Sequence, residues 1–205
     1  VYLRGAQVNP EDNLEQTRLG GHLECAGATI LAPGGGYALL APSLEARNVL
    51  VRGATLRGGI NLSGAVIAAD LDCAGTVVTR AEGLTIEASE LEARGSVVLR
   101  SARVEGETRL TASQVAGDMD CSSAVFANPG ETALEMSRTI VRGAFFLRRD
   151  ARVDGILSLT GASIGTIHDE AAAWPQTRDQ MQNPCRNGGF IDAPVDAATP
   201  LDRLS

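Results

Sequence analysis

The hydrophobic residues of this chain recur in a short unit that small residues interrupt. An apolar anchor is followed by a small residue three positions later and by an aliphatic residue five positions later, as in VRGATL with Val51, Ala54 and Leu56. The same spacing occurs in LSGAVI (62–67), LRSARV (99–104), LTASQV (110–115) and LTGASI (159–164). An amphipathic helix would need apolar residues at i, i+3, i+4 and i+7 over a dozen positions. The pattern therefore predicts strands of a few residues joined by tight turns.

A longer repeat, which we call the long repeat, is superimposed on the short unit. Three cysteines carry it at equal intervals, each preceded by an acid, and three arginines keep the same separation. The cysteines are Cys25, Cys73 and Cys121, the acids are Glu24, Asp72 and Asp120, and the arginines are Arg52, Arg100 and Arg148. A period of roughly 48 residues is in the range that indicates solenoids and repeat arrays. Anchors advance by equal steps from Val51 to Leu62 and to Cys73, and by wider steps through Ile86 to Leu99, so four units fill one long repeat.

Strands this short cannot bury an apolar face alone, whereas stacked coils can bury a shared lumen. We predict an all-β fold, a right-handed parallel β-helix with about 22–26 residues per coil and six or seven coils. Steps of five and six residues between apolar positions favour four short sides per coil. The number of sides and the handedness stay open at this stage, and right-handed crossover is the default for parallel strands.

The repeat ends near Ile167, which divides the chain into two parts. Residues 1–167 are expected to form the β-helix domain, and residues 168–205 a C-terminal cap or tail that is partly helical or irregular. An uncovered end of a β-helix exposes unpaired strand groups. We therefore expect this tail to fold over the last coil.

The three repeat cysteines are predicted to be small buried hydrophobes. Coils stack about 4.8 Å apart, so residues two coils apart lie about 9.6 Å apart. That separation is too large for a disulfide or for ligation of one metal ion. Cys25, Cys73 and Cys121 should accordingly lie one above another on the inward side, and we assign no metal site.

The repeated charges predict two columns on the surface. Glu24, Asp72 and Asp120 should point outward as an acidic column, and the three repeat arginines should form a basic column on another side. One interpretation is solubility and protection against sideways association. The other is a charged face for a partner.

Extra residues are expected at one corner of alternate coils. The chain lengthens in LAPGGG (31–36), TRAEG (79–83) and ANPGE (127–131), and Pro129 follows Pro33 by two long repeats. Loops along one edge are the expected interaction surface of a solenoid, although they would also serve to absorb differences in length. The candidate surface comprises Glu24, Asp72, Asp120, Arg52, Arg100, Arg148, Pro33, Gly34, Gly35, Asn128 and Pro129.

Composition narrows the function classes. The chain has 205 residues, a net charge of -7, 44% hydrophobic and 3% aromatic residues, and 18 basic residues that are all Arg. The absence of Lys excludes Schiff-base chemistry, and the acidic balance argues against binding nucleic acid. No apolar run reaches the ~20 residues of a membrane span. No CxxC pair occurs among the four cysteines, which favours a reducing, cytoplasmic location.

Candidate chemistry is sparse. His22 and His168 each lie near a carboxylate in sequence, Glu24 and Asp169, but no third ligand or nucleophile accompanies either of them. Both are expected at the surface, far apart along the stack. We therefore assign no catalytic residue and no cofactor.

The repeat region, about residues 1–167, resembles three groups of bacterial proteins. The small-x-aliphatic spacing is similar to pentapeptide-repeat proteins, right-handed four-sided β-helices, although a sixth residue is inserted here. The coils broken by Gly and Ala also resemble bactofilins, which polymerise end to end. GGINLSGAVI (58–67) and GILSLTGASI (155–164) match uncharacterised solenoid proteins with GxLxLxGAxV units, some labelled oxidoreductase. No GxGxxG opens a helix here, so the resemblance implies architecture and not that activity.

These features predict a non-catalytic β-helical scaffold or protein–protein interaction module, with end-to-end self-association as one form. An alternative is an acidic, DNA-mimicking regulator of a DNA-processing enzyme such as a topoisomerase, which the resemblance to pentapeptide-repeat proteins implies. Interleaved arginines, such as Arg94 and Arg103, would interrupt the negative face that this needs. A second alternative is a truncated β-helical carbohydrate-active enzyme, although no acids pair across a cleft in the sequence.

Overall fold

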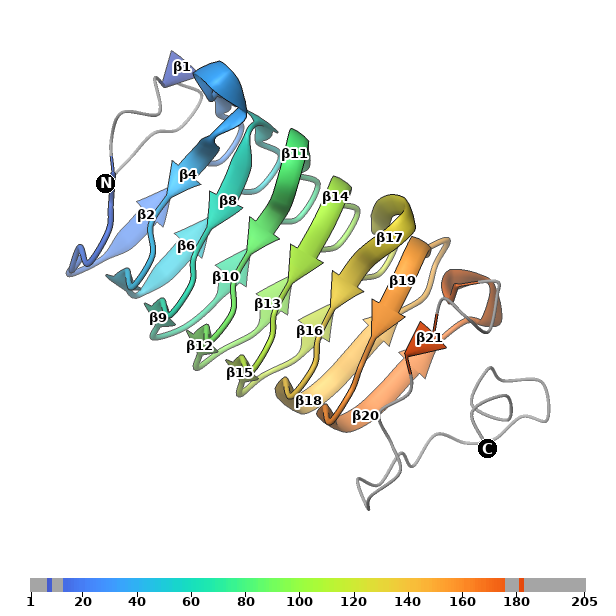
Figure 1. The fold of residues 1–205 in the computed structure, drawn as a ribbon. Coiled ribbons are helices and arrows are strands. Elements are labelled where there is room, and N and C mark those ends of the chain that lie inside the picture. The colour runs from blue at the N-terminus through green and yellow to red at the C-terminus, as the bar shows by residue number, and fades with distance from the viewer. Residues whose placement is uncertain (1–6, 9–12, 176–180, 183–205) are drawn as a thin grey trace.

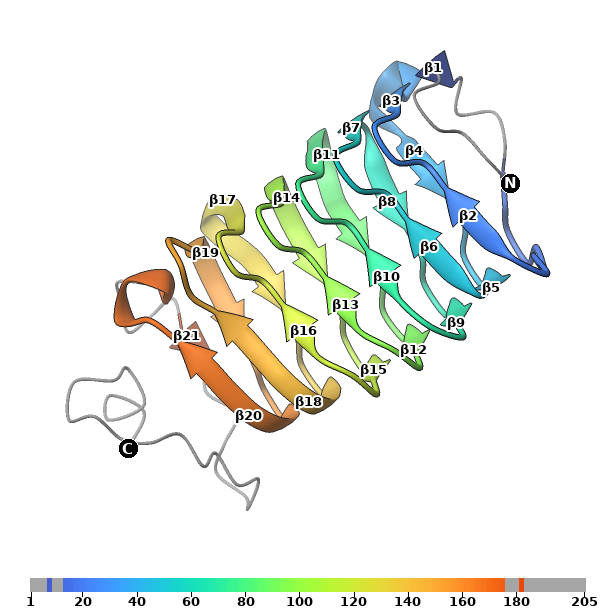
Figure 2. The same ribbon diagram turned by 180° about the vertical axis from the view of Figure 1, so that it is seen from behind.

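The chain folds as a right-handed parallel β-solenoid, as predicted. A computed structural model describes residues 7–8, 13–175 and 181–182. Successive coils stack along one axis, and every strand pairing is parallel (Figures 1 and 2). Leu23, in the first rung of one side, starts a row that ends at Ile167 six turns later. The prediction of six or seven coils is confirmed.

Each coil contributes strands to four sides, which were expected from the spacing. The first side, in front in Figure 2, contains β2 (His22–Glu24), β6 (Asn48–Leu50), β10 (Leu71–Asp72), β13 (Val97–Val98), β16 (Met119–Asp120) and the ends of β18 (Ile140–Leu147) and β20 (Ser163–Asp169). The second side contains β1 (Gln7–Val8), β3 (Thr29–Leu31), β7 (Thr55–Arg57) and the starts of β11 (Val77–Glu87), β14 (Arg103–Arg109), β17 (Val125–Glu135) and β19 (Arg152–Ser158).

The third and fourth sides complete the coil. The third, in front in Figure 1, contains β4 (Tyr37–Leu40), β8 (Gly59–Asn61), the ends of β11, β14, β17 and β19, and β21 (Met181–Gln182). The fourth contains β5 (Glu45–Ala46), β9 (Val66–Ile67), β12 (Glu92–Ala93), β15 (Gln114–Val115) and the starts of β18 and β20. Two single 3₁₀ turns, η1 (Pro33–Gly35) and η2 (Ala171–Ala173), are the helical elements of the described residues.

Coil length alternates, which explains the long repeat. On the first side Leu23 pairs with Val49, Val49 with Leu71 and Leu71 with Val97, so a long coil is followed by a short coil and then by another long one. The alternation continues through Met119 to the end of the row. One long coil and one short coil therefore make one long repeat. Their lengths are the two limits of the predicted range, which is confirmed.

The small residue of each unit closes a turn at two of the four corners. The amide of Ala54 donates to the carbonyl of the anchor Val51 over 3.0 Å, and the intervening Gly53 has φ of +62°. This is a β-turn whose third residue is left-handed, a conformation that glycine adopts without strain. Ser101 and Ser123 occupy the same turn position with φ near +57° and +58°. The residue that follows them is buried in the corner of the lumen, so it must be small.

One anchor differs from its predicted position. Ala88, not Ile86, accepts the turn hydrogen bond, from Leu91 over 3.3 Å, with Glu90 in the left-handed conformation. Side chains alternate between faces of a strand, so Ile86 and Ala88 both point inward. Burial alone could not choose between them. The extra residues of the long coil stand before Ala88 and lengthen the step from the preceding anchor, Cys73.

The lumen is filled by aliphatic side chains, with Phe126 and Phe145 also fully buried. The three repeat cysteines lie in one inward column, as predicted, where they alternate with Val51, Leu99 and Leu147. Because apolar surface on four sides faces the same lumen, each coil buries its side chains only when the next coil is in place.

A polar ladder runs along the corner between the fourth and first sides. Asn48 Oδ1 accepts from the Asp70 amide over 2.8 Å, and Asp70 Oδ1 accepts from the Ser96 amide over 2.8 Å. Ser96 Oγ then accepts from the amide of Asp118 over 3.1 Å. Each side chain thus accepts a hydrogen bond from a backbone amide at the corner of the next coil. The side chain must therefore fit closely against the backbone of that coil. Gly95 leaves room for this contact, since a Cβ there would overlap Asp70 Oδ1.

A polar residue takes the place of an apolar one in the cysteine column at the last coil. Asp169 occupies the inward position above Leu147, and its carboxylate accepts from Trp174 Nε1 over 2.6 Å. Ala173 and Trp174 are buried after η2, and β21 then pairs with β19. The predicted cap or tail spans residues 168–205, of which 176–180 and 183–205 lie outside the described residues. Within the described residues, no helix is long and apolar enough to span a bilayer.

The close packing in the polar ladder predicts which glycines are needed for stability. Gly95→Ala should lower the free energy of unfolding by about 1–3 kcal/mol, because the added methyl overlaps both Asp70 Oδ1 and the backbone of Ala69. Gly21 precedes the first rung, has nothing within 4 Å of an added Cβ, and has no positive φ. Gly21→Ala is the matched control and should leave stability unchanged or slightly raised. Urea denaturation followed by circular dichroism measures both, and equal effects would contradict the assignment.

Candidate interaction surface

The repeated aspartates have a structural role in the turns. Asp72 Oδ1 accepts from the amide of Ala74 over 3.0 Å, and Asp120 Oδ1 accepts from the amide of Ser122 over 2.9 Å. Asn61 makes the same contact to Ser63 at the opposite corner. An acid or amide just before the anchor therefore begins the turn, as Asx residues commonly do.

The arginine column does not lie on another side from the aspartates, so that prediction is wrong. Arg52 Nε lies 3.5 Å from Asp72 Oδ2, and Arg100 Nη2 lies 2.6 Å from Asp120 Oδ2. Each arginine follows the anchor of one coil, and each aspartate precedes the anchor of the next coil. The two positions differ by two residues around the coil, so the charges meet at one corner and offset each other.

The acids also fail to form a continuous column. Leu50 separates Glu24 from Asp72, and Val98 separates Asp72 from Asp120. Features that recur once in each long repeat appear only on every second coil, because one long repeat spans two coils. Glu24 is buried, with 5% of its surface exposed, and does not present the exposed carboxylate that was expected.

The pKa of Asp120 is lowered. Burial by itself would raise it, but the hydrogen bonds from Ser122 and from Arg100 outweigh that effect. Asp120 thus stays ionised to lower pH in the folded chain than in the unfolded one. The stability that this provides is present above the unfolded pKa of about 3.9 and is lost as the pH falls through the folded value.

The buried cysteines are poor nucleophiles. Burial raises the pKa of Cys25 to about 11 and of Cys73 to about 12, with the neighbouring acids Glu24 and Asp72 adding to the effect. Burial raises the pKa of Cys121 as well. The thiolate is the reactive form, so these side chains act as part of the apolar lumen.

The extra residues lie at the predicted corner, between the second and third sides of alternate coils. Strand register shifts there between Tyr37 and Leu39, between Thr79 and Leu84, and between Ala127 and Thr132. The three segments form one edge, visible in Figure 1 at η1 and at the bends of β11 and β17. We call residues 31–38, 79–85 and 127–133 the loop edge.

The loops of this edge are tied to one another and to themselves. Pro33 begins η1, and Gly34 and Gly35 follow with φ of +75°. Arg80 Nε donates to the Gly35 carbonyl over 2.9 Å, and its guanidinium lies 4.2 Å from the centre of the Tyr37 ring. These contacts join the first and second loops, two coils apart.

The third loop is held in a similar way and is accessible. Asn128 Nδ2 donates to the Thr132 carbonyl over 2.7 Å, and Pro129 is exposed. The loop folds over Gly155 of the next coil, where an added Cβ would lie 2.6 Å from the Asn128 carbonyl. The loop edge is therefore a shaped surface. The predicted members Pro33, Gly34, Gly35, Asn128 and Pro129 all belong to it.

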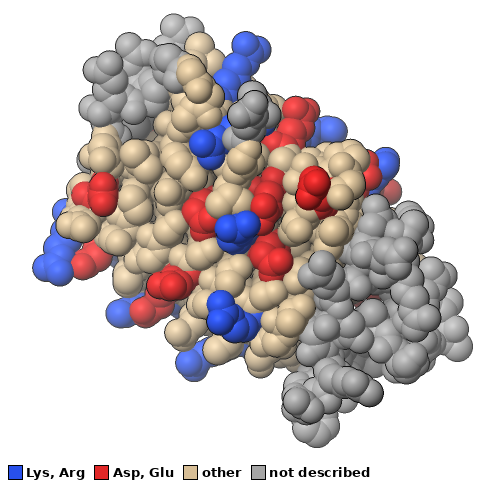
Figure 3. Space-filling view, viewed as in Figure 1, with Lys and Arg blue, Asp and Glu red and all other residues tan. Residues whose placement is uncertain are grey.

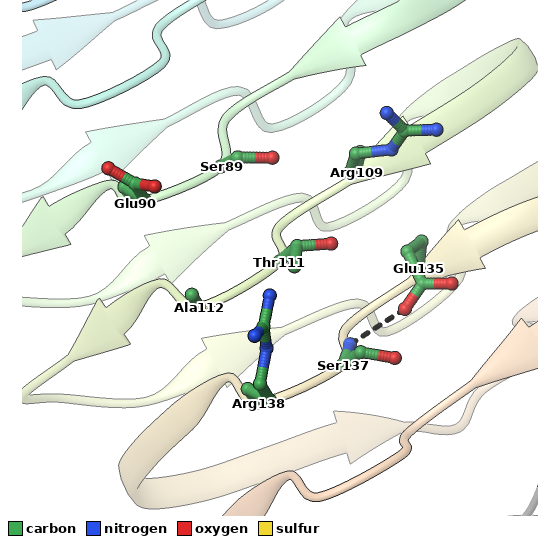
Figure 4. A pocket seen from close by; sticks show the side chains of 8 residues that line it. All are labelled: Ser89, Glu90, Arg109, Thr111, Ala112, Glu135, Ser137 and Arg138. Carbon is green, nitrogen blue, oxygen red and sulfur yellow. Dashed lines mark hydrogen bonds between the residues drawn. The ribbon is translucent and has the colours of Figure 1, made fainter.

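A shallow polar depression, which was not predicted from the sequence, lies at the corner between the third and fourth sides (Figure 4). It has a volume of about 450 Å³ and is lined by Ser89, Glu90, Arg109, Thr111, Ala112, Glu135, Ser137 and Arg138. Arg109 is engaged by Glu107 at 2.7 Å and Glu87 at 3.9 Å. The available signal was a hydroxyl residue directly after three successive anchors on this corner, namely Ser89 after Ala88, Thr111 after Leu110 and Ser137 after Met136.

Charges of both signs are interspersed over the face seen in Figure 3. His22 Nδ1 lies 2.8 Å from Asn48 Nδ2, and His168 stacks on Phe146. In the part of the chain that the structure describes, no three His, Cys, Asp or Glu residues are arranged to hold a metal ion.

No family model, no curated protein and no solved structure matches the chain. The architecture is that of a β-solenoid repeat protein. The more specific resemblances to pentapeptide-repeat proteins and bactofilins receive no support from these comparisons.

The two roles of Asp120 can be separated by substitution. Asp120→Asn keeps an oxygen for the Ser122 amide but loses the ion pair, and should cost about 0.2–1 kcal/mol at pH 7. Asp120→Ala loses both and should cost about 1–3 kcal/mol. Because the folded pKa is lowered, the deficit of the Asn variant should shrink as the pH falls below about 4. Urea denaturation at pH 7 and at low pH measures this, and a deficit independent of pH would contradict it.

Proposed function

We propose that the chain is a non-catalytic scaffold that binds protein partners through its loop edge. The observation that carries this proposal is the shape of that edge, since three loops repeat every second coil and are pinned to the rigid stack. Two coil spacings place equivalent loop positions about 9.6 Å apart. Partner binding would cost little ordering entropy there, because the loops are already fixed by Arg80 and Asn128.

The charge distribution favours this proposal over DNA mimicry. Asp72 and Asp120 are each paired with an arginine, and apolar Leu50 and Val98 stand between the acids. A mimic of duplex DNA would need a continuous negative face. The polar depression is shallow and its four charged residues balance, so it adds no reason to propose catalysis.

An exposed apolar side chain in the first loop makes the role of the loop edge testable. Leu31 is 45% exposed, and Ile140, on the fourth side, is 40% exposed. These are the two exposed large hydrophobic residues of the described chain. Buried apolar contacts at the centre of an interface supply much of its binding energy, so Leu31 and not Ile140 should contribute to partner binding.

The proposal predicts a difference between two matched variants. Immobilised wild-type protein, Leu31→Ser and Ile140→Ser should be compared for proteins retained from cells of the source organism, by quantitative mass spectrometry. We expect a partner that the wild type and Ile140→Ser retain equally and that Leu31→Ser loses by at least about tenfold, which corresponds to about 1.4 kcal/mol. Equal retention by all three proteins would contradict the assignment to the loop edge.

Self-association requires a separate measurement. Sedimentation velocity of the three proteins over a wide concentration range should show a larger species that Leu31→Ser weakens, if the partner is a second copy. A monomer at every concentration would exclude that form of the proposal and leave a different protein as the partner.

A further inference from the structure

The third long repeat departs from the first two on the first side of the solenoid. One long repeat after Asp120 the chain has His168, and one long repeat after Val98 it has Phe146. The register confirms the equivalence, because Asp120 pairs with Phe146 and Phe146 with His168. The acid of the repeat is thus missing from the last rung.

The arginine that this acid would pair with is retained. Arg148 is equivalent to Arg52 and Arg100, and no carboxylate lies within 4 Å of it in the described part of the chain. Arg100 donates from Nε to Asp120 over 3.0 Å, whereas Arg148 Nε is buried without an acceptor. A buried donor that lacks an acceptor is costly. The repeat therefore marks where a carboxylate belongs and does not supply it.

Two aromatic rings flank the same position. The rings of Phe146 and His168 are parallel within 10°, with centroids 5.0 Å apart. The Arg148 guanidinium lies 4.6 Å from the centre of the Phe146 ring. His168 is exposed and Phe146 is half-buried. A ligand can therefore approach the exposed His168 ring and the Nη groups of Arg148, whereas Nε of Arg148 is buried.

The surrounding charges favour an anion, although the whole chain is acidic. Residues 138–168 contain five arginines and two acidic residues, Asp150 and Asp154. Glu170 occupies the equivalent position one coil above Arg148, outside ion-pair distance, and Asp169 is engaged by Trp174. Residues 138–170 thus carry five arginines against four acids in a chain whose net charge is -7, and this small local excess of positive charge would favour an acidic partner segment there.

We propose that Arg148, Phe146 and His168 form a docking site for an acidic side chain of a partner protein. His168 itself stands at the rung position of Asp120, so the partner's carboxylate pairs with the Nη groups of Arg148 from the solvent side, and its neighbouring atoms pack on the Phe146–His168 stack. This deepens the interaction role proposed above and rests on it. The site is on the first side, away from the loop edge, so its failure would be distinguishable from a failure of the loop edge.

The test is a titration with two blocked peptides that differ in one charge. Blocked Gly-Asp-Gly is added to ¹⁵N-labelled protein, with blocked Gly-Asn-Gly as the uncharged control. We expect saturable shifts of the Arg148 Nε–Hε and His168 ring signals in the millimolar range with the first peptide only. His168→Asp supplies the missing carboxylate within the chain and should abolish the shift of the Arg148 signal, while Arg100→Gln should leave both shifts unchanged.

Several outcomes would overturn the proposal. These are equal shifts with both peptides, no saturation with Gly-Asp-Gly, or an Arg148 shift retained in His168→Asp. Shifts with inorganic phosphate but not with Gly-Asp-Gly would also overturn the assignment to a carboxylate. Arg148→Gln provides a second check, since it should abolish binding while retaining the circular dichroism spectrum of the wild type.

Discussion

The structure depends on the hydrogen bonds that each coil makes with the coils above and below it. A strand of two or three residues has no stability alone, and its amides and carbonyls find partners only in the neighbouring coils. This requirement fixes the register, and the register places equivalent residues in columns. The filled lumen, the corner ladder and the ion pairs are consequences of those columns.

Much of the fold was predictable because a solenoid converts sequence spacing into position. The equal separation of Cys25, Cys73 and Cys121 indicated the stacking, and the segments that lengthen the chain indicated the loop edge. The choice between Ile86 and Ala88 was not predictable, since both side chains point inward and only the turn hydrogen bond distinguishes them.

The surface was less predictable for a physical reason. The long repeat spans two coils, so residues that look adjacent in an alignment of repeats are separated in space by the intervening coil. The intervening coil contains Arg100, which forms an ion pair with Asp120, and Val98, which is the neighbour of Asp120 in the column. The residues of the loop edge and His168 are not required for these contacts between coils. Binding is proposed at those positions.

The most direct test of the account is a distance along the stack. Thr55 and Arg152 are exposed and lie four coils apart in one column. Spin labels at Thr55→Cys and Arg152→Cys, in a chain with Cys185→Ser, should give a narrow electron–electron distance distribution near ~19 Å, which is four coil spacings. The three buried native thiols should stay unlabelled. A broad distribution without a maximum near that distance would contradict the stacked, in-register solenoid.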